Sequence, residues 1–137
     1  MHRFRAPWFA LVLMLAGCRT GYADQLIDFE CGVAGGAFPV LRLANSPLEC
    51  GVPTTDGKRL TAHTTSTIVE EDGVTRYLIT GGERCSGAEC GLVIGGSLEI
   101  TMPRADGSAD VTYEVELADG TVEEGSASMP LCERMCL

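Results

Sequence analysis

Cysteine is the residue type in this chain with the most evident chemistry, because seven cysteines occur in 137 residues. One of them, Cys18, follows an apolar N-terminal segment. In a small domain of an oxidising compartment, an even number of cysteines predicts disulfides, each of which contributes about 2–4 kcal/mol to stability. We therefore expect three disulfides among the other six, which are Cys31, Cys50, Cys85, Cys90, Cys132 and Cys136.

Cys85 and Cys90 enclose the short segment Ser-Gly-Ala-Glu, and we predict that they pair with each other. Redox-active cysteines usually lie about two residues apart at a helix N-terminus, so the wider spacing favours a structural bridge. A competing interpretation is a zinc site with four thiolate ligands, although the spacings are loose for zinc. Its ligands would be Cys85, Cys90, Cys132 and Cys136.

The remaining four cysteines allow two arrangements. Cys31 could pair with Cys50 across a segment rich in Gly and Pro, which would leave Cys132 to pair with Cys136. Alternatively, the two C-terminal cysteines could reach back to Cys31 and Cys50. The spacing leaves both arrangements open, because connectivity does not follow from sequence alone.

A candidate acidic interaction face consists of four glutamates that we expect on neighbouring strands: Glu99, Glu114, Glu116 and Glu123. Like charges directly opposite each other destabilise a sheet by up to about 1 kcal/mol per pair. A compensating partner, either Ca²⁺ or a cationic protein surface, would relieve this repulsion. The alternative is a solvated face screened by salt. Residues 106–110 lack the ligand spacing of a Ca²⁺ loop, so we predict no metal site and no cofactor.

His63 is the only histidine after residue 2 and lies in a Thr-rich segment. Strand alternation would place it beside Thr61, Thr65 and Thr67 on a polar face. The chain has no Gly-x-Ser-x-Gly nucleophile motif that would accompany a catalytic histidine. We therefore predict no catalytic residue and no enzyme.

The charge of the chain favours some partners over others. Ten Lys and Arg residues oppose 19 Asp and Glu residues, which gives a net charge of −9. Loss of Arg3 and Arg5 with a signal peptide would make it −11. Such a surface repels phosphate backbones, so we expect no nucleic-acid binding, whereas a basic protein is a favourable partner.

The N-terminal segment has the layout of a secretory signal peptide, with Arg3 and Arg5 followed by mostly apolar residues at 6–16. The apolar run is too short for a transmembrane helix, which needs about 20 residues. Residues 15–18 read Leu-Ala-Gly-Cys and resemble the lipobox of bacterial lipoproteins. The resemblance implies that the Cys18 thiol receives a diacylglyceryl group and that the chain is cut before Cys18. The new amino group is then acylated, with palmitate as the expected fatty acid.

This resemblance divides the chain into a signal peptide (residues 1–17), a lipidated tether (18–24) and a single domain (25–137). Arg19 stands where an Asp typically retains a lipoprotein in the inner membrane. In a Gram-negative host, the resemblance therefore implies the outer membrane, with the domain facing the periplasm. The lipid would make the membrane contact, because the acidic chain has no polybasic patch for anionic lipids.

Turn chemistry predicts an all-β domain. Asp-Gly occurs at 56–57, 72–73, 106–107 and 119–120, and it favours the two-residue type I′ turn of a β-hairpin. We expect a small antiparallel β-sandwich or barrel of seven or eight strands, stapled by disulfides. The Gly95-Gly96 pair would form a bulge in the fifth strand or split it. The expected strands are 25–31, 38–43, 59–69, 74–80, 91–102, 109–118 and 121–129.

Two-residue turns at 106–107 and 119–120 would determine the register of the last three strands. The expected buried pairs are Met102–Val111, Ile100–Tyr113, Leu98–Val115 and Leu117–Val122. On the exposed face, Glu99 would lie opposite Glu114, and Glu116 opposite Glu123. Because Glu124 would then face inward, we expect a bulge near Gly125 that returns Met129 to the buried face.

These observations lead to a functional hypothesis. The chain is expected to be a lipid-anchored envelope lipoprotein that acts as a non-enzymatic binding or structural module. The alternative is a periplasmic inhibitor of a basic hydrolase such as lysozyme, because small acidic β-lipoproteins with disulfides include such inhibitors. That alternative rests on similarity of size and charge.

We predict that Cys18→Ala releases the protein from the membrane fraction. Two long acyl chains hold a domain durably, at about 0.8 kcal/mol per buried CH₂ group, whereas one chain gives only reversible binding. Mass spectrometry of the wild-type protein should show a diacylated or triacylated N-terminal cysteine. An unmodified Cys18 in the exported protein would contradict the lipobox hypothesis.

Overall fold

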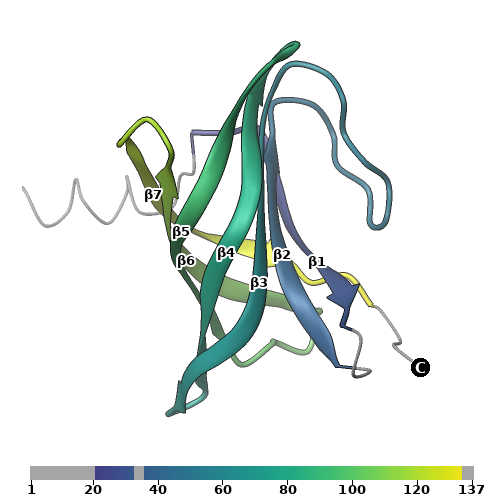
Figure 1. The fold of residues 1–137 in the computed structure, drawn as a ribbon. Coiled ribbons are helices and arrows are strands. Elements are labelled where there is room, and N and C mark those ends of the chain that lie inside the picture. The colour runs from purple at the N-terminus through teal and green to yellow at the C-terminus, as the bar shows by residue number, and fades with distance from the viewer. Residues whose placement is uncertain (1–20, 33–35, 134–137) are drawn as a thin grey trace, which may run out of the picture.

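The computed structural model describes residues 21–32 and 36–133, which form one sheet of seven strands (Figure 1). Each strand pairs with its neighbours in the chain, and all of these pairings are antiparallel. None of the described residues belongs to a helix long and apolar enough to cross a membrane. The strands are β1 (Asp24–Cys31), β2 (Ala37–Ala44), β3 (Lys58–Glu71), β4 (Val74–Ser86), β5 (Glu89–Thr101), β6 (Ser108–Leu117) and β7 (Val122–Pro130).

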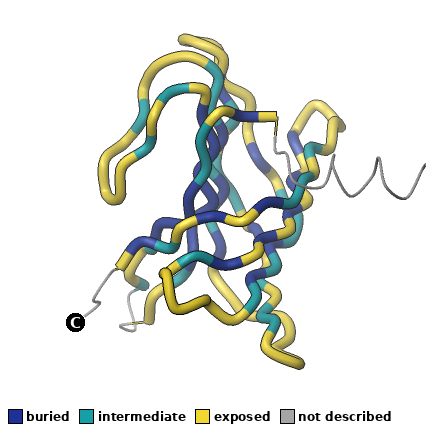
Figure 2. Tube along the Cα trace, turned by 180° about the vertical axis from the view of Figure 1, so that it is seen from behind, coloured by how far each residue is buried: buried dark blue, intermediate teal, exposed yellow. Residues whose placement is uncertain are grey.

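The sheet curls into a half-barrel, and its inner face holds the hydrophobic core. Burial alternates along β6, where Val111, Tyr113 and Val115 point inward. Successive side chains lie on opposite faces of a strand, so apolar residues at every second position bury one face. Burying one such side chain contributes about 1.5–3 kcal/mol. Figure 2 shows the buried positions along the middle of the strands, and the predicted all-β fold is confirmed.

Gly82 and Gly96 let the sheet bend within its two long central strands. Their φ angles are +134° and +130°, and a Cβ atom at either would lie 2.0 Å from a carbonyl oxygen of the adjacent strand, that of Thr61 or Glu114. Only glycine tolerates this conformation at such a close approach. The expected bulge is present, because the β5–β6 register shifts just before Gly95. β4 likewise continues through its glycines to Ser86 instead of ending at residue 80.

One Asp-Gly pair forms the predicted two-residue turn. Asp72 and Gly73 connect β3 to β4 with φ angles of +53° and +77°, as a type I′ turn requires. Asp56-Gly57 does not form a tight hairpin. It ends the long connection of residues 45–57 between β2 and β3, which extends to one side of the sheet in Figure 1.

The loop that ends at Gly107 is longer than predicted, which shifts the β5–β6 register by two residues. The Gly107 N–H donates to the Arg104 carbonyl at 3.0 Å, as in a turn followed by a glycine with positive φ. A shift of two keeps each side chain on its predicted face, although its predicted partner is wrong. Met102 instead lies outside the strand and is 73% exposed. The observed pairs are Ile100–Val111, Leu98–Tyr113 and Gly96–Val115.

The loop at Asp119-Gly120 shifts the β6–β7 register by one residue. Its glycine has a φ of +92° and donates a backbone hydrogen bond of 3.0 Å. Glu123 therefore lies opposite Val115, and the predicted Glu116–Glu123 pair is wrong. The bulge predicted near Gly125 is absent, because the β6–β7 pairing has no register shift there. The loop at Asp119-Gly120 already supplies the one-residue shift that the bulge was expected to provide. A shift of one exchanges the two faces of a strand, so Glu123 moves to the inner face.

The two edge strands, β1 and β7, run in the same direction and meet at a seam. A single parallel bridge joins Ile27 to Leu131, just after β7. The Cys132 N–H donates to the Ile27 carbonyl at 2.8 Å. Cys50, in the 45–57 connection, forms a disulfide with Cys132 over a separation of 82 residues. Among the described residues, this bridge, this hydrogen bond and the Cys50–Cys132 disulfide hold the seam together.

The disulfides resolve part of the predicted pairing. The Cys85–Cys90 bond is confirmed, and the Cys50–Cys132 bond belongs to the arrangement in which the C-terminal cysteines reach back. The zinc interpretation is wrong, because three of its four thiolates are in disulfides. Cys31 is also disulfide-bonded. Cys136 and the proposed lipidation site Cys18 lie outside the described residues.

Arg42 holds the 45–57 connection against the outer face of β1 and β2. Its Nη1 lies 3.2 Å from the Asp28 carboxylate and donates to the Glu49 carbonyl at 2.9 Å, and its Nη2 donates to the Val52 carbonyl. Asp28 also accepts from the Gly51 N–H at 2.8 Å. Both charged side chains are nearly inaccessible to solvent. Removing one partner of such a pair leaves a buried charge, which typically costs about 3–5 kcal/mol.

We predict that Gly82→Ala destabilises the protein by about 3 kcal/mol or more, because its Cβ would overlap the Thr61 carbonyl oxygen at a φ that alanine avoids. Gly81→Ala is the matched control, since its Cβ meets no atom within 4 Å. Urea denaturation of the oxidised proteins measures both changes. Equal losses in the two variants would contradict the proposed role of Gly82.

Candidate functional site

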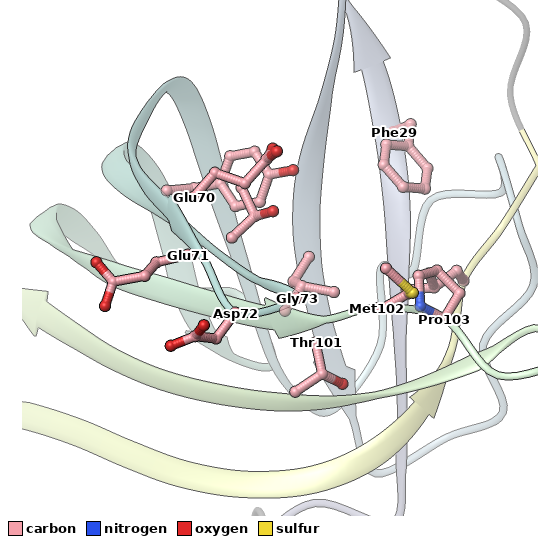
Figure 3. Close-up of a pocket in the computed structure, with 12 residues that line it drawn as sticks. Phe29, Glu70, Glu71, Asp72, Gly73, Thr101, Met102 and Pro103 are labelled. Carbon is pink, nitrogen blue, oxygen red and sulfur yellow. The ribbon is translucent and has the colours of Figure 1, made fainter.

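The candidate site is a pocket of about 460 Å³ at the end of the half-barrel where β3 turns into β4 (Figure 3). One side is mainly apolar, and the other carries the acidic residues of the β3–β4 hairpin. None of the lining residues is basic. The lining consists of Phe29, Glu70, Glu71, Asp72, Gly73, Thr75, Tyr77, Ile100, Thr101, Met102, Pro103 and Leu131.

The apolar side combines residues from distant parts of the sequence. Phe29 comes from β1, Met102 and Pro103 follow β5, and Leu131 comes from the seam. Figure 3 shows Phe29, Met102 and Pro103 together on one side of the pocket. The register shift that removes Met102 from β5 gives it this position, and its N–H donates to the Gly73 carbonyl at 2.6 Å. Met102 thereby connects the loop after β5 to the β3–β4 hairpin.

The acidic side follows from the register of the hairpin. Glu70 lies opposite Thr75, and Thr75 lies opposite the inward-facing Ile100. Cross-strand partners share one face of a sheet, so the Glu70 side chain belongs to the inner face. In Figure 3 the Glu71 and Asp72 carboxylates point away from the apolar side. Glu70 is therefore the carboxylate that faces the pocket.

Tyr77 is partly buried and lies on the same inner face as Glu70. Burial raises the pKa of the Tyr77 hydroxyl, and the nearby Glu70 charge raises it further, whereas an interaction with Thr75 lowers it. A negative charge beside the hydroxyl disfavours the tyrosinate. Glu70 and Tyr77 therefore share the inner face that lines the pocket.

Tyr22, just before β1, packs at the opposite end of the half-barrel. Its hydroxyl donates to the Glu123 carboxylate at 2.9 Å, and the Lys58 ammonium lies 4.7 Å from its ring centroid. The Arg84 Nε lies 2.8 Å from the same carboxylate without hydrogen-bond alignment. Burial and the Glu123 charge raise the pKa of Tyr22 to about 12. β1 then runs from this end towards the end of the half-barrel where β3 turns into β4 (Figure 1).

The structure brings together three of the four glutamates of the predicted acidic face. Glu99, Glu114 and Glu116 lie on the outer face of β5 and β6, but Glu99 faces Thr112 instead of Glu114. Arg76 partly neutralises Glu99 at 3.8 Å. The predicted exposed position of Glu123 is wrong, because the one-residue register shift turns its side chain inward to Tyr22 and Arg84. Glu124 takes its place on the outer face, opposite Glu114.

His63 lies on the outer face of β3 with Thr61 and lines a polar groove beside the 45–57 connection. Its Nδ1 is 3.3 Å from a Glu30 carboxylate oxygen, without hydrogen-bond alignment. The expected alternation with Thr65 and Thr67 is wrong, because the β3–β4 register shifts on either side of Thr64. The interrupted register separates these residues from the face that carries His63.

Potential metal ligands meet at one place within the described ranges, where Glu83 lies near Cys85 and Cys90. Both cysteines are in a disulfide, and a metal ligand must be a free thiolate. This cluster therefore offers one carboxylate only.

Some of the residues that line the pocket could be recognised from the sequence. Glu70, Glu71 and Asp72 are consecutive acidic residues at a predicted hairpin turn, and Tyr77 follows on the next strand. The bulges of β3 decide which carboxylate faces inward, and Phe29 and Leu131 approach only through the seam. The acidic side of the pocket could therefore be predicted from the sequence, whereas the apolar side could not.

We predict that Glu70→Gln lowers the pKa of Tyr77, because the substitution removes the charge that disfavours the tyrosinate. The pKa should stay above its ordinary value, since burial remains. Glu71→Gln is the control and should have a smaller effect. NMR titration of ¹³Cζ-labelled tyrosine resolves each residue, and equal effects of the two variants would show that Glu70 does not face the pocket.

The candidate site belongs to a chain without a match among the proteins compared with it. Scans of protein-family models, of curated proteins and of solved structures gave no match.

Proposed function

We propose that this protein is a lipid-anchored lipoprotein of the bacterial envelope that acts as a non-enzymatic binding module. The observation that carries the proposal is the pocket beside the β3–β4 hairpin, at the end of the half-barrel opposite Tyr22. The lipobox-like segment supplies the anchor, and the pocket supplies the binding site.

The pocket has the properties of a small-molecule site. Its volume of about 460 Å³ falls in the range of roughly 300–1,000 Å³ that is usual for ligand pockets. Such sites are mostly apolar with a few polar groups and often lie in the mouths of barrels. The Asp72-Gly73 turn and the Cys50–Cys132 disulfide hold opposite sides of this pocket in place. Preorganisation of this kind reduces the entropy lost on binding.

The tether supports an orientation in which the pocket points away from the membrane. Tyr22, four residues after Cys18, is already buried in the domain. At about 3.5 Å per residue, a chain of that length spans at most ~14 Å. A lipidated Cys18 would hold the Tyr22 end near the bilayer. In a Gram-negative host, the pocket would then open to the periplasm.

A second candidate function is inhibition of a basic hydrolase such as lysozyme. The exposed carboxylates of Glu114, Glu116 and Glu124 share the outer face of β6 and β7 and favour a basic protein surface. Affinity capture from envelope extract separates the candidates. Recovery of a basic hydrolase that this protein inhibits would support the inhibitor.

We predict that residues 19–137, exported behind a cleavable signal peptide, bind the neutral apolar probe N-phenyl-1-naphthylamine in a saturable manner. Thr75→Phe should weaken binding at least tenfold, because Thr75 lines the pocket and an aromatic ring would fill it. Thr112→Phe is the matched control on the exposed outer face of β6. Fluorescence titration measures both variants, and equal affinity of the two would exclude the pocket as the binding site.

A further inference from the structure

We infer that the pocket selects an amphipathic cation, a small molecule that joins an apolar body to an ammonium or guanidinium group. The inference rests on the proposed binding function and specifies its ligand. It follows from the unequal distribution of charge around the pocket, from the position of Glu70 and from the aromatic lining.

Three carboxylates, those of Glu70, Glu71 and Asp72, form the rim of the pocket, and none of the residues that line the pocket is basic. Glu70, Glu71 and Asp72 are all exposed, and none of them is in a salt bridge within the described part of the chain. The arginines nearest in sequence have other partners. Arg76 pairs with Glu99 on the outer face, and Arg104 pairs with Asp110. A cation entering the pocket would therefore meet carboxylates that no protein cation already neutralises.

Glu70 places one of these charges beside the apolar lining. Glu70 on β3 lies opposite Thr75 on β4, and Thr75 lies opposite Ile100 on β5, which is 7% exposed. A carboxylate at the edge of an apolar cavity attracts a cation more strongly than one in open water, because the local dielectric is lower. These three neighbouring residues thus place one negative charge at the edge of the pocket, next to the apolar surface of Ile100.

Two aromatic rings add to the preference for a cation. Tyr77 shares the inner face with Glu70 and lines the pocket. Phe29 lies on the apolar side with Met102 (Figure 3). An ammonium group over an aromatic face is attracted by the ring quadrupole. The Met102 side chain is flexible and can adapt to an apolar body. An anionic ligand, in contrast, would be repelled by all three rim carboxylates.

The volume favours a small molecule over a protein segment as the source of this cation. A pocket of about 460 Å³ has room for a ligand of drug-like size or smaller. A basic protein would need a much larger surface, roughly 800 Å² on each partner. The pocket therefore fits a small free organic cation, and binding of a basic protein at the same pocket is an outcome that would overturn this inference.

Three probes with the same eight-carbon alkyl chain test the inference on residues 19–137: octyltrimethylammonium, 1-octanol and nonanoate. We expect the ammonium to bind about tenfold more tightly than octanol, and nonanoate to bind most weakly. Raising the salt concentration to 0.5 M should reduce the advantage of the ammonium, because salt screens the rim carboxylates. Calorimetry measures the affinities, and NMR shift mapping identifies the site.

Glu70→Gln should reduce the preference for ammonium over octanol at least threefold, while octanol affinity stays unchanged. Glu114→Gln is the matched control, because Glu114 lies on the outer face of β6. If Glu70→Gln does not fold, the double variant Glu71→Gln/Asp72→Asn tests the same rim charge.

The outcomes separate the inference from the proposed function. Equal affinity of the three probes at the pocket would overturn the selection of cations and leave a binding module. Ammonium binding that maps to the outer face, or that Glu114→Gln weakens, would also overturn it. Absence of binding by every probe, including the neutral naphthylamine, would contradict the binding function itself.

Discussion

The odd number of strands is the constraint on which the rest of this structure depends. In an antiparallel meander of seven strands, β1 and β7 run in the same direction, so they cannot continue the antiparallel ladder between them. The sheet therefore curls towards closure but meets at a seam with one parallel bridge, Ile27–Leu131. Unpaired edge strands are a liability, because they can pair with other chains. Here a covalent bond and a covering loop protect the edge.

The loop reaches the seam because a buried ion pair directs it. Arg42 and Asp28 bind carbonyl and N–H groups of the 45–57 connection, which positions Cys50 to bond with Cys132. Buried ion pairs often add little net stability, since desolvation opposes their attraction. Their geometry is nevertheless specific, and this pair selects one path for a loop without regular secondary structure. The disulfide then ties that path to the end of the sheet.

The pocket is a consequence of the same arrangement. The β3–β4 hairpin and the loop after β5 lie at one end of the half-barrel, and the seam brings Phe29 and Leu131 to them. The opposite end is filled by Tyr22, Glu123 and their partners. One end is thus closed around Tyr22, whereas the other carries the pocket. This asymmetry suits a module that is anchored at one end and binds at the other.

The sequence by itself determined the approximate positions of the seven strands, the inward-facing positions of β6 and the Cys85–Cys90 bond. These features depend on alternation along a strand and on contacts between near neighbours, which local chemistry specifies. Only the tertiary structure decided the loop lengths at Gly107 and Gly120, and thereby the inward position of Glu123. An Asp-Gly pair is compatible with a two-residue turn and with a longer loop, and packing of the flanking strands selects between them. The Cys50–Cys132 bond and the apolar side of the pocket arise in the same way, because both join segments that approach only when the sheet curls.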